Sequence, residues 1–141
     1  MQPSPNERRP YNGLTRLEPT LPSASYWDET CYKQDLESIW YRNWIFVCRE
    51  ADLAEPLAFR RFRIGSQEIF ILRDEAGTLR GFFNTCRHRG SQLCRQESGR
   101  LKARLITCPY HAWSYTLQGE LARVPSKSLP DEFDKADYPL Y

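Results

Sequence analysis

The chain has 141 residues, of which 40% are hydrophobic and 13% aromatic, so we expect it to bury one compact core and not two full domains. Its 20 basic and 18 acidic side chains nearly balance. This balance excludes the large net positive charge that attracts nucleic acid or an anionic membrane. The longest apolar run, 44–48, is far shorter than the roughly 20 residues that span a bilayer. With no apolar signal segment at the N-terminus, we expect a soluble cytoplasmic protein without nucleic-acid or membrane partners.

The N-terminal part of the chain divides into an arm and a helix. Residues 1–24 contain five of the ten prolines, which predicts an extended arm with little structure of its own. We assign 25–43 to an N-terminal helix that begins at Asp28 and ends near Arg42. Asp28 can cap the first amides, and apolar side chains repeat at helical spacing at Tyr32, Leu36, Ile39 and Trp40.

The following stretch, 44–128, has the pattern of a β domain. Short apolar or alternating runs predict strands at 44–48, 57–64, 67–73, 79–84, 104–107 and 113–116. Turn signals separate them at 65–66, 74–77, 98–99 and 118–119. This spacing predicts a mainly β fold, an antiparallel sandwich or barrel.

The last segment, 129–141, ends in the sequence Tyr138-Pro-Leu-Tyr141. Its apolar and aromatic side chains need a surface on which to pack, and nothing follows them. We interpret 129–141 as the start of a connection to a further domain.

The cysteines and histidines indicate a metal centre. The five cysteines form an odd set, which disfavours a disulfide framework and favours metal ligands or free thiols: Cys31, Cys48, Cys86, Cys94 and Cys108. Only two histidines occur, His88 and His111, and each lies within three residues of a cysteine. We interpret the three cysteines without a neighbouring histidine as free thiols.

Two short segments therefore carry the chemistry. They are Cys86-Arg-His88-Arg-Gly90 and Cys108-Pro-Tyr-His111, and each can offer one thiolate and one imidazole from a tight turn. The second begins 22 residues after the first, which is about the length of one hairpin. Two hairpin tips can then face one another across a metal centre, and Gly90 is expected to supply a positive φ for the first.

These two segments resemble the signature of the Rieske iron-sulfur proteins, Cys-x-His followed by Cys-x-x-His. The resemblance implies a [2Fe-2S] cluster in which Cys86 and Cys108 bind one iron while His88 and His111 bind the other. Two ferric ions, two sulfides and two thiolates sum to zero charge, so this centre accepts an electron more easily than a four-thiolate cluster. A structural zinc site is the alternative for the same four side chains, although zinc sites usually pair two cysteines in one knuckle.

The flanking residues distinguish subfamilies. Respiratory members carry a disulfide between the two loops, whereas Ser91 and Tyr110 stand at the comparable places here. Because this disulfide is absent, we expect the cluster to have a reduction potential toward the low end of the Rieske range, roughly −150 mV.

The chain after the arm is most similar to the α subunits of Rieske non-haem iron oxygenases. The segments that carry this resemblance are Leu21-Pro22, Ile39-Trp40, Asn43-Trp44, Phe83-Asn84, the two ligand segments, Trp113-Ser-Tyr115, Gly119 and Phe133-Asp-Lys-Ala-Asp137. It implies a Rieske-like β sandwich or barrel with two cluster-binding hairpin loops. Two departures concern loop geometry: Ala112 stands where the family commonly has Gly, and 19 residues separate His88 from Cys108.

The resemblance also implies partners. In that family a reductase or ferredoxin supplies electrons, and a mononuclear iron in a separate catalytic domain, often in a neighbouring subunit of a trimer, receives them. That iron needs two further histidines and a carboxylate, so we expect it only in a catalytic domain absent from these residues. A stand-alone Rieske ferredoxin is the alternative, and aromatic acids, polycyclic rings and quaternary ammonium compounds all remain open as substrates.

Several residues near the ligands allow a functional and a structural interpretation. Arg87 and Arg89 can steer an acidic reductase or can simply be solvated. Trp113 and Tyr115 can shield the cluster or belong to the core, and Tyr110 can orient its loop.

Overall fold

The computed structural model describes residue 16, residues 18–125 and residues 129–141. It divides into two compact units, Met1–Asn43 and Trp44–Tyr141. Most of the predicted arm, 1–15 and 17, lies outside the described residues. No helix in the described ranges is long and apolar enough to cross a membrane.

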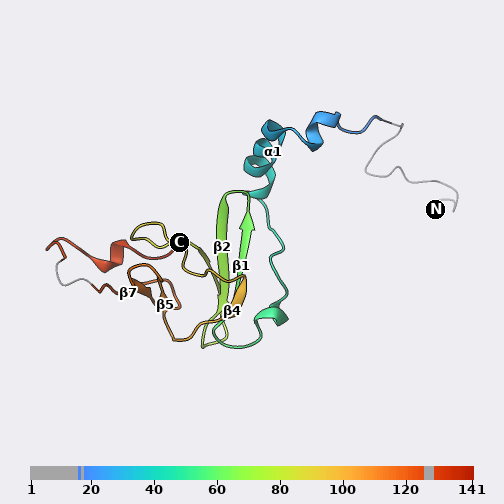
Figure 1. The fold of residues 1–141 in the computed structure, drawn as a ribbon. Coiled ribbons are helices and arrows are strands. Elements are labelled where there is room, and N and C mark those ends of the chain that lie inside the picture. Colours follow the sequence, from blue (N-terminus) through green and yellow to red (C-terminus); the bar gives the residue numbers. More distant parts are fainter. Residues whose placement is uncertain (1–15, 17, 126–128) are drawn as a thin grey trace, which may run out of the picture. The chain divides into compact units, whose positions relative to one another are not determined.

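The first unit contains the predicted helix in a modified form (Figure 1). A short 3-10 turn, Ser23–Tyr26, precedes α1, Glu29–Asp35, and a π-helical turn, Leu36–Trp40, continues it. Asp28 caps α1 as expected, since its Oδ1 accepts hydrogen bonds from the amides of Thr30 at 2.8 Å and Cys31 at 3.2 Å. These two bonds lower the pKa of the Asp28 carboxyl, because they stabilise its charged form.

The second unit holds two antiparallel sheets. The larger has the order β3-β2-β1-β4 and the smaller the order β5-β6-β7, and Figure 1 shows the long β1–β2 pair beside the smaller sheet. The strands are β1 Ala58–Ile64, β2 Gln67–Arg73, β3 Leu79–Phe83, β4 Ser98–Arg100, β5 Ile106–Thr107, β6 Ser114–Tyr115 and β7 Leu121–Arg123. A 3-10 turn, Glu50–Leu53, precedes β1. The mainly β antiparallel fold is thus confirmed.

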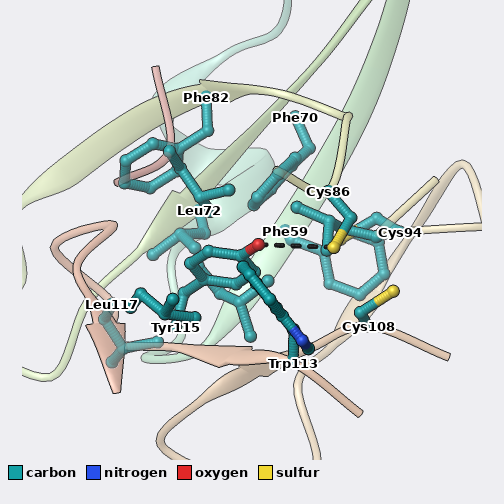
Figure 2. Packing of buried hydrophobic residues seen from close by; sticks show 14 residues of the cluster. Phe59, Phe70, Leu72, Phe82, Cys86, Cys94, Cys108, Trp113, Tyr115 and Leu117 are labelled. Carbon is teal, nitrogen blue, oxygen red and sulfur yellow. Dashed lines mark hydrogen bonds between the residues drawn. The ribbon is translucent and has the colours of Figure 1, made fainter. Parts of the chain in front are cut away.

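The alternating pattern places one face of the larger sheet in the core. Phe70 and Leu72 on β2 are fully buried, as two residues on one face of a strand should be. Phe70 pairs with Phe82 on β3 in register, with ring centroids 5.6 Å apart. Figure 2 shows these side chains packed together with Tyr115 and Trp113 from the second sheet's hairpin. The core therefore lies directly behind the two loops that carry the predicted ligands.

Two strand-level predictions are wrong. Residues 44–48 form no strand, and 98–99, predicted as a turn, belong to β4. The side of β1 that β2 leaves free pairs with β4, through the register Phe59 with Gly99, so 44–48 does not occupy it. Gly99 permits this pairing, because a Cβ there would lie 3.2 Å from the Phe59 ring.

The C-terminal residues pack on this unit. Leu140 is buried, and its amide donates to the carbonyl of Gly119 at 2.8 Å. Tyr141 accepts a hydrogen bond from the amide of Phe83 at 2.6 Å, at the end of β3. Gly119, with φ +94°, lies so close to Phe82 that a Cβ would approach its ring to 2.6 Å. The chain end thus spans the two sheets.

Candidate metal centre

The first predicted ligand loop, which carries Cys86 and His88, follows β3 and is closed by hydrogen bonds within its own backbone. The amide of Cys86 donates to the carbonyl of Ser91 at 2.8 Å, and the amide of Gly90 donates to the carbonyl of Cys86 at 3.0 Å. Gly90 has the expected positive φ, +69°. This tight turn holds Cys86 and His88 on the same short loop.

The second predicted ligand loop, which carries Cys108 and His111, connects β5 to β6 and repeats that hydrogen-bond pattern. The amide of Cys108 donates to the carbonyl of Trp113 at 2.8 Å, and the amide of Ala112 donates to the carbonyl of Cys108 at 3.0 Å. Ala112 has a left-handed backbone, with φ +56°. The residue that departs from the family pattern therefore occupies the conformation that Gly adopts most easily.

The two cysteines form a buried pair. Cys86 and Cys108 are each 2% exposed, and neither is in a disulfide, nor are the other three cysteines. Burial raises the pKa of the Cys86 thiol, and the nearby Cys108 thiol raises it further. A buried thiol with a raised pKa, such as that of Cys86, suits a site whose charge is balanced by a bound cation.

A buried tyrosine contacts this pair. The hydroxyl of Tyr115 lies 3.3 Å from the sulfur of Cys86 and accepts a hydrogen bond from the amide of Arg87 at 3.1 Å. Burial raises the pKa of Tyr115, so the hydroxyl keeps its proton. Because the Arg87 amide already donates to the oxygen, the hydroxyl proton is available to the sulfur (Figure 2).

The two histidines form a second, exposed pair. Their Nδ1 atoms lie 3.2 Å apart, with ring centroids separated by 4.9 Å. Two nitrogens bound at about 2.0–2.1 Å to one tetrahedral metal ion lie about 3.3 Å apart, so the rings fit a shared ion. Desolvation lowers the pKa of His88, and the charges of His111 and Arg89 add to this effect. The neutral imidazole is the form that binds metals.

The four donors therefore lie as two pairs. Among the described residues, no group of three or more His, Cys, Asp or Glu side chains converges on one point that could hold a metal ion. A single zinc ion would draw all four donors together, whereas each iron of a Rieske [2Fe-2S] centre takes two protein ligands. The chemistry and arrangement of the donor set fit the two-iron centre better.

Each imidazole stacks on an aromatic ring. His88 lies parallel to Trp113, with centroids 4.8 Å apart and planes at 10°. His111 stacks on Tyr110 at 3.7 Å and 27°. Trp113 is buried and makes T-shaped contacts with Phe133 and Tyr138, with ring centroids 5.9 and 5.6 Å apart. Trp113 thus belongs both to the core and to the site.

Sequence reasoning missed one residue that holds the first loop. Asn84 is 1% exposed, and its Oδ1 accepts hydrogen bonds from the amides of Leu93 at 3.1 Å and Cys94 at 2.8 Å. Its Nδ2 donates to the carbonyl of Cys94 at 2.8 Å. Asn84 therefore ties the start of the loop to its end. An amide side chain directly after an apolar strand was the available signal.

The fold and the paired cysteines and histidines are those expected of an iron-sulfur domain. The family model described as Rieske [2Fe-2S] domain matches residues 43–133. The chain belongs to this family.

Known relatives are oxygenase components. The chain is 39% identical over 106 residues to the large oxygenase component of salicylate 5-hydroxylase from a Ralstonia species, covering 74% of this chain and 25% of the relative. It is 36% identical over 110 residues to biphenyl 2,3-dioxygenase subunit alpha from Rhodococcus jostii, covering 78% and 23%.

Solved structures agree. A quaternary ammonium Rieske monooxygenase in complex with gamma-butyrobetaine superposes with a TM-score of 0.79 and 34% identity, over 86% of this chain and 34% of that chain. This confirms the Rieske-like fold. The chain spans about a quarter to a third of these relatives.

Proposed function

We propose that this chain is the electron-transfer domain of a Rieske oxygenase α subunit. In this proposal it accepts electrons from a reductase or ferredoxin and passes them to a mononuclear non-haem iron in a catalytic domain outside these 141 residues. That iron supports hydroxylation or demethylation with O2. The relatives favour this function over a stand-alone Rieske ferredoxin, since those named above are oxygenase components.

We assign Cys86 and Cys108 to one iron and His88 and His111 to the other. The observation that carries the assignment is the separation of the donors into a buried thiol pair and an exposed imidazole pair with Nδ1 atoms 3.2 Å apart. Such a centre, when bound, supplies one-electron transfer. The other residues of this chain hold the four donors in place and determine the hydrogen bonds and solvent access around them.

The protein groups around the donors perform distinct tasks. The Tyr115 hydroxyl donates to the Cys86 sulfur, and a hydrogen bond to a ligating sulfur stabilises added negative charge and raises the potential. The buried core excludes water from the cysteine side. The imidazole edges lie at the surface, where an electron can leave toward an acceptor.

The proposal extends to the organisation of the whole protein. We propose that 1–24 is an extended arm, 25–43 a helical segment, 44–128 the cluster domain and 129–141 the start of the connection to the catalytic domain. We further propose a cytoplasmic location, because reduced nicotinamide cofactors there supply such reductases with electrons. We also propose a trimer in which the acceptor iron belongs to a neighbouring subunit.

Iron and acid-labile sulfide analysis tests the cluster. We expect two irons and two sulfides per chain and a Rieske electron paramagnetic resonance signal after reduction. His111→Ala should abolish that signal, whereas Cys94→Ser, a buried cysteine outside the four assigned ligands, should retain it. Bound zinc, or an unchanged signal in His111→Ala, would contradict the assignment.

Oxygen uptake separates the two electron-transfer functions. An oxygenase domain encoded in the reading frame directly after Tyr141, with reductant-dependent oxygen consumption by the longer chain, would support the oxygenase subunit. A stop at that point with no such consumption would favour the ferredoxin.

A further inference from the structure

Charge is unevenly distributed along the chain. Between Cys86 and His111 the only acidic residue is Glu97, against six basic residues: Arg87, Arg89, Arg95, Arg100, Lys102 and Arg104. The whole chain has 20 basic and 18 acidic residues, so the rest of it carries a net negative charge. The part that bears the ligands is thus a basic region on an otherwise slightly acidic protein.

A shallow groove with a volume of about 460 Å³ lies within this basic region. Apolar side chains, among them the buried Phe59 and Leu93, line part of it. Three basic side chains and no acidic one are among the described residues that line it: Arg95, Arg100 and Lys102. An apolar floor with a charged rim is the usual composition of a protein-binding surface.

No acidic side chain in the described part of the chain forms an ion pair with the cations of this groove. Among the described residues, no ion pair involves Arg95 or Lys102, and Arg100 Nε donates to the carbonyl of Pro56 at 3.0 Å. Arg104, which does not line the groove, instead pairs with Glu75 at 2.7 Å. Carboxylates of a partner can therefore meet the groove cations without displacing an internal pair.

The groove also reaches the candidate metal centre. Pro109 lines it and is bonded directly to Cys108, and consecutive Cα atoms lie only 3.8 Å apart. Cys94, which Asn84 ties to the first ligand loop, lines it as well. Neither His88 nor His111 lines the groove. A protein seated there approaches the centre from its cysteine side.

From these observations we propose that the groove is the docking surface for an acidic electron-donor protein. This inference rests on the proposed function, and it names the partner class and its point of entry. The donor loses one electron and the cluster domain gains one, with no bond formed and no proton transferred. Electrons then enter beside Cys108 and leave through the exposed imidazoles, so a donor and an acceptor can use different faces.

Stopped-flow reduction kinetics test the docking surface. The chain with its cluster is mixed with a photoreduced acidic plant-type [2Fe-2S] ferredoxin, whose potential lies below the Rieske range, and cluster reduction is followed by its visible absorption. The groove variant is Arg95→Gln with Lys102→Gln. The matched control is Arg63→Gln with Arg123→Gln, two exposed arginines of the same unit that do not line the groove.

We expect the second-order rate constant of the groove variant to fall about tenfold at low ionic strength, because charge steering typically changes association rates by that order. The difference should vanish near 1 M salt, where the Debye length is about 3 Å. The control should keep the rate of the unaltered chain. Reduction by dithionite, which needs no docked protein, should be equal in all three proteins.

Equal rates in the groove variant and the unaltered chain would overturn the docking inference. An equal fall in the control would also overturn it, since net charge alone would then explain the effect. Both outcomes leave the proposed function intact as long as dithionite still reduces the cluster. A chain that takes up no cluster overturns both proposals, and its missing visible absorption reveals this before any donor is added.

Discussion

The two ligand loops share one backbone design but hold their histidines differently. In each loop the cysteine carbonyl accepts from the amide four residues later, and the cysteine amide donates to the carbonyl five residues later. Yet His88 stacks on the buried Trp113 of the other loop, whereas His111 stacks on Tyr110, which is 57% exposed. A buried ring thus holds His88 in place, whereas an exposed ring holds His111.

The largest expected effect breaks the restraint on His88. Trp113→Ala removes a buried ring that packs on His88, Phe133 and Tyr138, and such truncations cost about 3–5 kcal/mol of folding free energy. Tyr110→Ala on the exposed side should cost about 0.5 kcal/mol or less. Urea unfolding measures both. Equal losses would contradict the difference between the two loops.

The next effect concerns how each loop is closed at its base. Asn84→Ala leaves the buried amides of Leu93 and Cys94 without their acceptor, which should cost about 2–3 kcal/mol. The second loop is closed by the β5–β6 pair, where Thr107 Oγ1 lies 3.1 Å from Ser114 Oγ. Thr107→Val, which removes only that hydroxyl contact, should cost about 1 kcal/mol. A smaller loss for Asn84→Ala in denaturant unfolding would refute this order.

A third effect is electrochemical and belongs to the first loop. Tyr115→Phe removes the hydrogen bond to the Cys86 sulfur, and a loss of about 1 kcal/mol corresponds to about 40 mV in a one-electron potential. The potential should therefore fall by about 40 mV in protein-film voltammetry. Tyr138→Phe, a matched hydroxyl removal away from the sulfurs, should leave it unchanged. A fall of equal size in Tyr138→Phe would remove the assigned role of Tyr115.

The smallest effect compares the fifth residue of each loop. Both positions are left-handed, but one is Gly90 and the other Ala112. A side chain in this conformation costs about 1–2 kcal/mol, partly offset by the greater flexibility of unfolded glycine. Ala112→Gly should therefore stabilise the fold by about 0.5–1 kcal/mol, and Gly90→Ala should destabilise it by a similar amount. Thermal unfolding of both variants checks the opposite signs.

Features encoded locally were predictable from the sequence. β2 has the predicted bounds, 67–73, because alternation and flanking turns define it without reference to other segments. Asp28 caps α1 for the same reason. The two ligand segments were recognisable because each presents its cysteine, histidine and turn residue within six positions.

Features that depend on distant partners were not predictable. β4 became a strand because Gly99 can approach Phe59, 40 residues earlier in the sequence. The π-helical turn after α1 has no signal that we recognised. The role of Asn84 depends on amides nine and ten residues later in its own loop, and the stacking of Trp113 on His88 is visible only once the two loops face each other.

The closure of the second unit by Leu140 and Tyr141 has a consequence for maturation of the protein. During synthesis β1, β2 and β3 leave the ribosome long before these residues, which bond to Gly119 and to Phe83. Until Phe133 and Tyr138 arrive, the outer side of Trp113 has no covering, and the imidazole stacked on it has no firm support. Iron and sulfide insertion therefore best follows the synthesis of 129–141.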